Sequence, residues 1–336
     1  MTIKIGINGL GRIGRCVLRA AFEEGSHTKD FEVVAVNGPA AVDTHKHLIK
    51  YDSVHGRFNH PVEADGGDLR IAGKKVKLSH ERDPKQIPWG DMGVDIVLEC
   101  SGKFNKRDDA AQHLAGGAKR VIVSAPSEGA DATVVYGVNN DTLKADHQVI
   151  SIGSCTTNAL APVVKVLHEL IGIESGFMTT VHAYTGDQNL VDNSHKDLRR
   201  ARAAASSIIP TSTGAAKTIG IIIPELKGKL DGVAMRVPTP NVSLVDLAFT
   251  AKRDTSVDEI NKAFKDAARG AYKGILDASD EKLVSIDYTH TPYSSIADLT
   301  GTYVMNGKLC RIASWYDNEW GFSNRMLDVA KLWSTL

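Results

Sequence analysis

The sequence predicts an α/β domain with a doubly wound parallel sheet, followed by an α+β domain with a mixed or antiparallel sheet. Three observations lead to this prediction. In the first half of the chain, short apolar strands alternate with helical segments, as in parallel sheets crossed by helices. A glycine-rich turn directly follows the first strand. In the second half, the strands are separated by longer spans, which favours a mixed or antiparallel sheet.

The first domain is expected to span residues 1–153, with the C-terminal helix 318–336 packing back onto it. The expected strands are Ile3–Ile7, Phe31–Val36, Val94–Cys100, Arg120–Ser124 and Val149–Ser151, and the expected helices are Arg12–Glu24 and Asp108–Leu114. This alternation favours a parallel, doubly wound sheet.

The second domain is expected to span residues 154–317 and to open with a buried helix after Cys155. Its expected strands are Gly176–His182, Gly232–Val237, Val242–Ala251 and Leu309–Trp315. In the final segment, apolar side chains recur at helical spacing, namely Phe322, Met326, Val329, Ala330 and Trp333.

The composition excludes several classes of partner. Lys+Arg and Asp+Glu both number 40, so the formal net charge is zero and no basic field points to nucleic acid. No apolar stretch approaches the ~20 residues of a membrane span, and the N-terminus reads as a strand rather than a signal peptide. The four cysteines lie far apart and show no metal-ligand spacing. We therefore expect no metal, reduced thiols and a cytoplasmic protein.

The glycine-rich turn predicts a dinucleotide site. Gly9, Gly11 and Gly14 follow a strand and open a helix. The first glycine permits the tight turn, the second lets the backbone approach a pyrophosphate, and the third lets helix pack against strand. The alternative is a purely structural glycine turn. At the end of the second strand, where an acidic residue usually holds the adenosine ribose, this chain has Gly38. The missing carboxylate removes the repulsion that excludes a 2′-phosphate, so we expect NADP to be tolerated beside NAD.

Cys155 stands at the start of a helical stretch, after a run of small turn formers. The unpaired N–H groups and the dipole of a helix N-terminus favour the thiolate form of a cysteine placed there. A lone cysteine is more commonly a small core residue. Here a nucleotide fold precedes Cys155 and His182 follows it, which favours a nucleophile.

Eight stretches distributed along nearly the whole chain resemble the phosphorylating glyceraldehyde-3-phosphate dehydrogenases of the bacterial type. The stretches are Ile7–Arg15, Lys50–Ser53, Glu81–Pro84, Ser154–Asn158, Thr179–Thr185, Ile209–Lys217, Arg236–Val242 and Trp315–Gly321. The resemblance implies that Cys155 attacks glyceraldehyde 3-phosphate to form a hemithioacetal, with His182 as general base and thiol activator. Oxidation then gives a thioester, which inorganic phosphate cleaves to 1,3-bisphosphoglycerate.

The resemblance also implies two anion sites and a set of cofactor contacts. The first anion site holds the substrate phosphate through Thr185 and Arg236. The shared or second site holds the attacking phosphate through Ser154, Thr156, Thr213, Gly214 and Arg200. Hydroxyls, glycine backbone and arginine are suitable ligands for a dianion. For the neighbouring arginines of the stretch 196–202, a solvated charged surface is the alternative. The implied cofactor contacts beside the glycines are Arg12, Ile13, Arg82, Ser124 and Asn318. Asn318 would hold the nicotinamide amide, although it could simply cap a helix.

The chain departs from the family pattern at cofactor-binding positions. NAD users usually carry Asp in place of Gly38, and Leu-Pro in place of Asn193-Ser194. In the family the latter pair comes from a neighbouring subunit of a homotetramer and lies near the adenosine ribose. Both changes favour dual or NADP-preferring use.

Two further departures lie around the cysteine. Ile152-Gly153 replaces the usual Asn-Ala, a change for which the sequence offers no firm account. Ala159 stands where the family often has a second cysteine, so a local disulfide cannot protect an oxidised Cys155.

Two other functions remain open at this point. Erythrose-4-phosphate dehydrogenase is a sister activity in which water, rather than phosphate, resolves the thioester. This chain keeps His182–Thr185 and Ser212–Lys217 as in the phosphorylating enzymes. A non-catalytic redox sensor or binding protein would be expected to lose Cys155, His182 or the arginines, and all are present.

Overall fold

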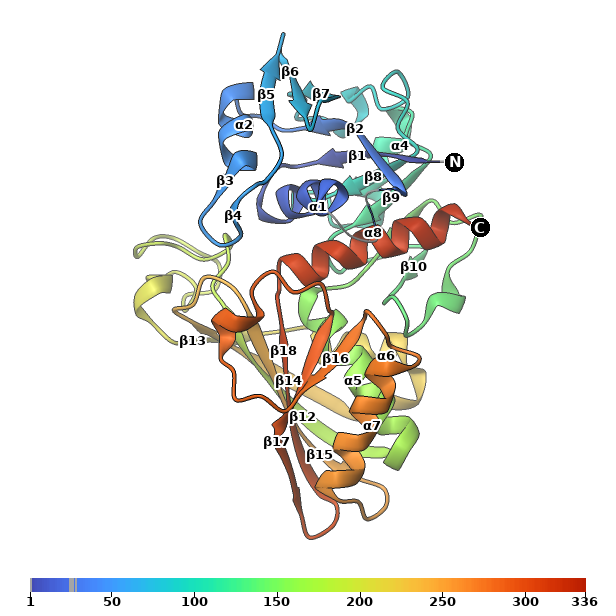
Figure 1. Cartoon of the computed structure of the whole chain (residues 1–336), viewed down its shortest axis with the longest axis vertical. Coiled ribbons are helices and arrows are strands. Elements are labelled where there is room, and N and C mark those ends of the chain that lie inside the picture. Colours follow the sequence, from blue (N-terminus) through green and yellow to red (C-terminus); the bar gives the residue numbers. More distant parts are fainter. Residues whose placement is uncertain (1, 24–26, 28) are drawn as a thin grey trace. The chain divides into compact units, whose positions relative to one another are not determined.

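The computed structural model describes residues 2–23, 27 and 29–336, and the chain divides into two compact units. The first unit comprises Met1–Tyr136, Asn140–Gly153 and Ser323–Leu336, and the second comprises Gly137–Asn139 and Ser154–Phe322. Helix α8, Trp320–Ser334, therefore begins in the second unit and continues in the first (Figure 1).

The first unit is built around a largely parallel sheet. Its strands are β1 Ile3–Asn8, β2 Phe31–Asn37, β3 Tyr51–Asp52, β4 Gly56–Arg57, β5 Val62–Asp65, β6 Asp68–Ile71, β7 Lys74–Ser79, β8 Ile96–Glu99, β9 Arg120–Val123, β10 Ala132–Thr133 and β11 Val149–Ser151. Its helices are α1 Arg12–Phe22, α2 Val42–Lys50, α3 Arg107–Ala110 and α4 Gln112–Ala115, with short 3-10 turns at Pro84–Gln86 and Asn140–Thr142.

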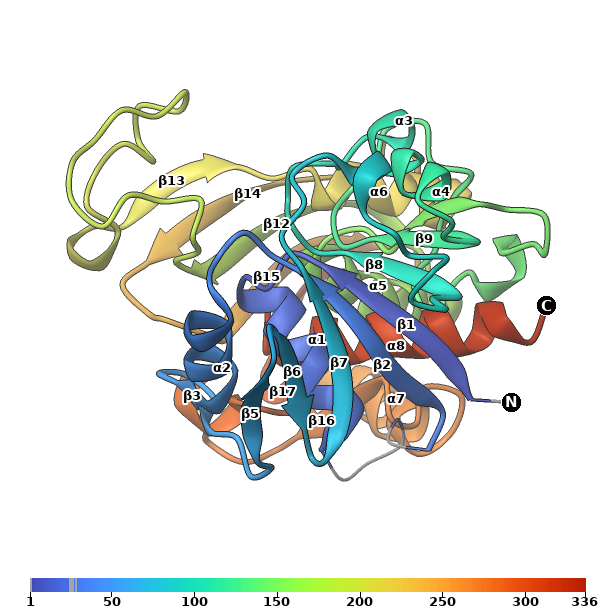
Figure 2. The ribbon, with the colours of Figure 1, turned by 90° about the horizontal axis from the view of Figure 1, so that it is seen from above.

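Nine of these strands form one sheet, in the order β10-β11-β9-β8-β1-β2-β7-β6-β5. All neighbours are parallel except β7-β6 and β6-β5, which are antiparallel. In Figure 2 the neighbouring strands lie side by side in the sheet order β5, β6, β7, β2, β1, β8 and β9. The chain leaves β1 towards β2 and returns to its other side at β8, so the strand order reverses between β1 and β8. Such a reversal is where doubly wound sheets bind their ligands.

The C-terminal part of α8 completes the core of the first unit. Met326, Val329 and Trp333 are fully buried. The indole Nε1 of Trp333 donates to the Lys144 carbonyl at 3.0 Å, and Lys331 Nζ lies 2.8 Å from Asp30 Oδ2. These contacts hold the last residues of the chain against two earlier segments of the first unit, around Asp30 and Lys144.

The second unit contains a mixed sheet with the strand order β13-β14-β12-β15-β18-β17-β16. Its strands are β12 Ile173–Ala183, β13 Ile209–Ser212, β14 Leu230–Val237, β15 Ser243–Ala251, β16 Leu276–Ser279, β17 Ser295–Met305 and β18 Leu309–Tyr316. Its helices are α5 Cys155–Ile171, α6 Ala215–Ile222 and α7 Val257–Arg269, with 3-10 turns at Ala204–Ser206, Pro224–Leu226 and Ser285–Tyr288. The three helices lie together beside the sheet (Figure 1). Only β12-β14 and β16-β17 pair in parallel.

The predicted fold classes are confirmed, whereas some element boundaries differ. Helix α1 ends at Phe22, and Glu24, where the predicted helix ended, lies outside the described residues. The single helix predicted over 108–114 is two short helices, α3 and α4, which meet at Ala111. Among the helices described, none is long and apolar enough to cross a membrane.

Candidate active site and nucleotide pocket

The glycine-rich turn after β1 has the geometry that close approach by a phosphate requires. Gly9 has a φ of +94°, and a Cβ on it would lie 2.6 Å from the Ser101 backbone. A Cβ on Gly14 would lie 1.9 Å from the Gly9 carbonyl oxygen, so only glycine allows α1 to pack there. At Gly11 an added Cβ would meet no described atom within 4 Å, which leaves the backbone at the start of α1 open to a ligand.

A cavity of about 380 Å³ lies at this end of the first sheet. Four of its lining residues are ones that the sequence singled out, namely Gly9, Gly11, Gly38 and Arg82. Others were not expected, including Asn8, Asn37, His45, Ser101 and Phe104. Arg12, Ile13, Gly14 and Ser124 lie outside this lining. The size and the open glycine backbone suit part of a dinucleotide.

A buried carboxylate braces the wall of the cavity. Glu99, at the end of β8, is fully buried and accepts hydrogen bonds from Asn8 Nδ2 at 2.5 Å and from the Ser101 backbone N–H at 2.7 Å. Its Oε2 also lies 2.8 Å from His113 Nε2. Asn8 and Ser101 both line the cavity, so this network holds the ends of β1 and β8 in fixed positions.

The side chain of Arg12 is engaged within the protein. Its Nη2 donates to Asp52 Oδ1 at 3.0 Å. Burial alone would raise the pKa of Asp52, but Arg12 and the backbone N–H groups of Val54 and His55 hold that pKa well below its ordinary value. Arg12 thus ties α1 to the β3–β4 turn, and its expected contact with a cofactor stays a prediction.

In the second unit, two elements bring Cys155 and His182 together. Ser154 caps α5, since its Oγ accepts from the Thr157 backbone N–H at 3.0 Å, and this places Cys155 as the first residue of the helix. His182 is the penultimate residue of β12. Cys155 Sγ lies 3.5 Å from His182 Nε2.

Arg236 lies against the other side of the imidazole. The parallel register of β12 and β14 pairs His182 with Arg236. Arg236 Nη1 lies 2.8 Å from His182 Nδ1 and donates to the Ala183 carbonyl at 2.9 Å. His182 Nδ1 is itself 2.7 Å from that carbonyl. The tautomer that donates Nδ1–H to this carbonyl turns the Nε2 lone pair towards the sulfur, as a general base needs, whereas the tautomer that accepts from Arg236 at Nδ1 places a proton on Nε2.

The electrostatics differ from the expectation drawn from the helix N-terminus. Burial raises the pKa of the Cys155 thiol above its ordinary value, although Arg236 and hydrogen bonds from Thr156 act against it. Burial, with Arg236 next in effect, lowers the pKa of His182 to about 3. Both shifts favour the uncharged thiol and the uncharged imidazole in the free protein.

Two hydroxyl networks support this pair, and the sequence reasoning missed both. The Tyr316 hydroxyl lies 2.9 Å from Thr156 Oγ1 and 2.8 Å from Thr180 Oγ1, and its ring lies edge-on to His182. Ser243 Oγ accepts from the Ala183 N–H at 3.0 Å and donates to Asn318 Oδ1 at 2.9 Å. Asn318 is thus oriented by β15.

Beside Ser154, Thr156 and Arg236 at the Cys155–His182 pair, the other residues expected to bind anions occupy three places in the second unit. Arg200 donates to Thr211 Oγ1 at 3.0 Å and pairs with Asp187, and it lies close enough to His182 to help lower its pKa. Thr185 lies in the loop after β12, beside a cavity of about 200 Å³. Thr213 and Gly214 precede α6. Among the described residues, no hydrogen bond joins Thr185, Thr213 or Gly214 to the Cys155–His182 pair.

Comparison with known proteins identifies the family. Residues 154–318 match the glyceraldehyde 3-phosphate dehydrogenase C-terminal domain, and residues 3–107 match the glyceraldehyde 3-phosphate dehydrogenase NAD binding domain. The chain belongs to the glyceraldehyde-3-phosphate dehydrogenase family. It is 58% identical over 330 residues to the glyceraldehyde-3-phosphate dehydrogenase of Xanthobacter flavus, with 98% of each chain covered. Identities of 57% and 55%, with the same coverage, relate it to the enzymes named so in Cereibacter sphaeroides and Geobacillus stearothermophilus.

Family membership assigns the cavity of the first unit to an NAD binding domain. The residues around the cavity fit such a ligand, because Gly9 and Gly11 leave backbone exposed where phosphates approach and Arg82 adds a positive charge.

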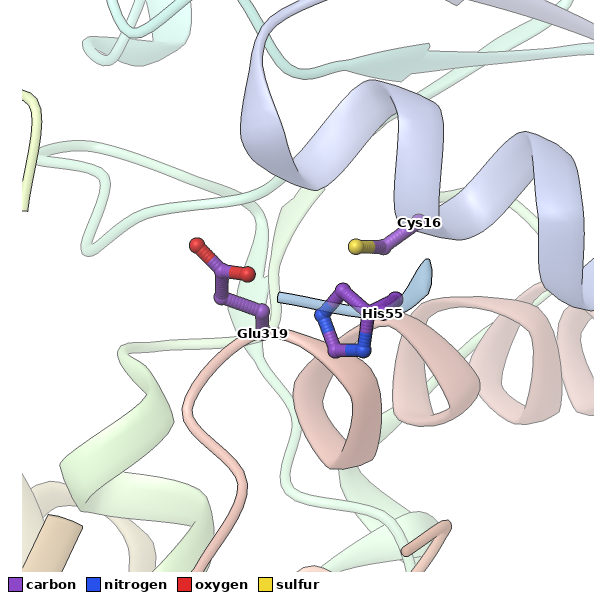
Figure 3. A group of neighbouring side chains, drawn as sticks. All are labelled: Cys16, His55 and Glu319. Carbon is purple, nitrogen blue, oxygen red and sulfur yellow. The ribbon is translucent and has the colours of Figure 1, made fainter. Parts of the chain in front are cut away.

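Figure 3 shows a cysteine and a histidine of the first unit, which are distinct from the Cys155–His182 pair of the second unit. Cys16 is buried on α1, and His55 lies in the turn between β3 and β4. Glu319, in the same picture, belongs to the second unit. A structural zinc site takes four protein ligands and a catalytic one takes three. Among the described residues of the first unit shown in the picture, Cys16 and His55 offer two ligand atoms, which is fewer than either kind of zinc site takes.

Proposed function

We propose that this chain catalyses the reversible oxidation of glyceraldehyde 3-phosphate with inorganic phosphate, giving 1,3-bisphosphoglycerate, with a nicotinamide dinucleotide as oxidant. The observation that carries the proposal is the 3.5 Å approach of Cys155 Sγ to His182 Nε2. Sulfur addition to an aldehyde requires a thiolate, and a neutral imidazole at this distance can take the thiol proton as the bond forms.

The remaining steps use the same two side chains. His182 passes the thiol proton to the aldehyde oxygen as the hemithioacetal forms, so it is neutral again and takes the hydroxyl proton as that carbon is oxidised to a thioester. When bound, the nicotinamide supplies the two-electron acceptor for this oxidation. Phosphate oxygen then attacks the thioester carbon and Cys155 leaves as a thiolate. Arg236, half-buried beside the imidazole, favours the thiolate by its charge in the first and last steps of the reaction.

We assign the two phosphates of the reaction to the arginines of the second unit. Arg236 would bind the substrate phosphate together with Thr185, and Arg200 would bind the attacking phosphate together with Ser154, Thr156, Thr213 and Gly214. The Nε of Arg236 is buried and makes no hydrogen bond to the described residues, so it has a donor to offer a ligand. Arg200 is already paired with Asp187, and an anion would compete for it.

We propose that the enzyme accepts NADP as well as NAD. Gly38 lies in the cavity lining, where an acidic side chain would repel a 2′-phosphate, and Arg82 in the same lining would attract it. Asn193 and Ser194 lie on an exposed loop of the second unit, where they could reach a neighbouring subunit's nucleotide.

A homotetramer is part of this proposal. The loop that carries Ser194 also exposes large apolar side chains, with Leu190 80%, Leu198 82% and Ile208 70% exposed. Apolar side chains gathered in this way mark an association surface, and a second copy of the chain would cover them. Light scattering on the purified protein measures the mass of the assembly. The mass of four chains is expected, and the mass of one chain would contradict the proposed tetramer.

The test of the activity is an initial-rate experiment with glyceraldehyde 3-phosphate, with NAD or NADP, and with or without phosphate. Phosphate-dependent turnover with both cofactors is expected, and Cys155→Ser is expected to abolish it. An initial rate that does not depend on phosphate would favour the sister activity on erythrose 4-phosphate, in which water cleaves the thioester. Phosphate-dependent turnover with NAD alone would reject only the proposed use of NADP.

A further inference from the structure

His45, the fourth residue of α2, is an unpaired polar group in the wall of the nucleotide cavity. It is only 5% exposed and belongs to the cavity lining. Neither ring nitrogen makes a hydrogen bond to any residue that the structure describes. Buried polar side chains are normally paired, because an unpaired one loses its hydration without compensation. An imidazole in this position has ring nitrogens to offer to a ligand in the cavity.

Gly38 is what allows the imidazole to occupy this place. A Cβ on Gly38 would lie 2.7 Å from His45 Nε2 and 2.8 Å from Cε1, closer than side-chain atoms approach in proteins. The backbone of Gly38 already has other partners: its N–H donates to Ser79 O at 3.0 Å, and its carbonyl lies 2.9 Å from His80 Nδ1. The glycine therefore leaves space for the ring, and its backbone is already paired with other groups.

The charges around His45 favour an anion. Burial lowers the pKa of His45 below its ordinary value. The nearby Gly38 backbone acts in the opposite direction although its geometry falls short of a hydrogen bond, and His80 and Arg15 lower the pKa further. In the same cavity lining, Arg82 and Lys103 contribute positive charge and Glu81 negative charge. The ring is thus neutral in the free protein at pH 7, and a dianion beside it would raise its pKa.

We propose that His45 determines cofactor choice by hydrogen-bonding the 2′-substituent of the adenosine ribose and by taking up a proton from solvent when that substituent is a phosphate. This inference rests on the proposed use of a dinucleotide. It makes Gly38 and His45 a functional pair: the glycine removes a repulsive carboxylate, and the histidine provides a cation only when a phosphate is present.

The test is titration calorimetry on the full chain with NAD, NADP and adenosine 2′-monophosphate, near pH 7.5, in two buffers that differ in ionisation enthalpy. The difference between buffers counts the protons taken up. The wild type is expected to take up more protons with NADP than with NAD. His45→Leu is expected to lose this difference and to shift the NADP-to-NAD affinity ratio about tenfold towards NAD, equivalent to ~1.4 kcal/mol.

Two further variants separate binding from packing. His45→Gln keeps a hydrogen-bonding group but cannot be charged, so it is expected to retain part of the NADP affinity without the proton uptake. His47→Gln, on the exposed face of the same helix, is the matched control and is expected to leave both quantities unchanged.

Equal losses of NAD and NADP in His45→Leu would overturn the inference, because they would indicate a packing role. Proton uptake that persists in His45→Leu would overturn it too. In both cases the wild type still binds NAD and turns over, so the proposed function stands. Absence of nucleotide binding in the wild type would instead reject the proposed function.

Discussion

Removing the imidazole of His182 changes how stability depends on pH, because this histidine is held neutral in the folded chain. It is 4% exposed, and burial together with Arg236 lowers its pKa to about 3 from an ordinary value of 6.5. The unfolded chain binds a proton at this residue below about pH 6.5, whereas the folded chain does so only near pH 3.

The sign follows from these two values. Stability from the depressed pKa is fully present above pH 6.5 and is lost as pH falls towards 3, because protons favour the unfolded state throughout that window. Each pH unit within the window costs about 1.4 kcal/mol, so lowering the pH to about 5 removes about 2 kcal/mol through His182 alone. This loss of free energy is set by the pKa of His182 in the unfolded chain. It is the same for any pKa in the folded chain that lies well below 5.

The assay is urea unfolding of wild type and His182→Gln at about pH 8 and pH 5, at one fixed protein concentration because the proposed tetramer would make stability depend on concentration. Between pH 8 and pH 5, the free energy of unfolding is expected to fall by about 2 kcal/mol less in the variant than in the wild type. His47→Gln, an exposed change, should follow the wild type. An equal loss in wild type and His182→Gln would refute the reasoning, because it would mean that His182 accepts protons equally well in both states.

Three further outcomes are expected. Gly38→Asp should lower kcat/KM with NADP relative to NAD at least tenfold, since a carboxylate ~4 Å from a 2′-phosphate at an effective dielectric of ~20 repels it by up to about 4 kcal/mol; an unchanged ratio in steady-state kinetics would contradict this. Peroxide inactivation at Cys155 should resist rescue by dithiothreitol because Ala159 offers no resolving thiol, and full recovery of activity would argue against it. Gly14→Ala should destabilise the first unit by about 1–3 kcal/mol, since its methyl meets a backbone carbonyl, whereas Gly11→Ala should melt like the wild type in calorimetry.

The fold could be predicted where burial leaves a simple pattern. Strands β1, β2 and β9 are short apolar runs because both faces of a parallel sheet are covered. The antiparallel extension β5–β7 was missed, because its strands alternate apolar and charged residues and resemble surface loops. The sequence feature that indicates these strands is the Gly66-Gly67 turn between β5 and β6, where both φ angles are positive.

The site was less accessible to sequence reasoning. Cys155 stood out through its helix start, but its distance from His182 depends on how α5 meets β12, and no local pattern encodes that. Tyr316 and Ser243 were missed because a hydroxyl on a strand reads as an ordinary polar residue until its partners are known. His45 was hidden for another reason: helix α2 was not predicted, so the buried face of that segment could not be distinguished from its exposed face.

The path of α8 has a consequence for synthesis on the ribosome. The first unit needs Ser323–Leu336 to complete its core, yet these residues are translated after the whole of the second unit. At ~5–20 residues per second, roughly 9 to 36 s separate the emergence of Gly153 from that of Trp333. During this interval the first sheet lacks the side chains that bury its apolar face, whereas nearly all of the second unit has already been made. The N-terminal half of the nascent chain is therefore the part that needs protection from aggregation, and loss of a few C-terminal residues should destabilise the domain made first.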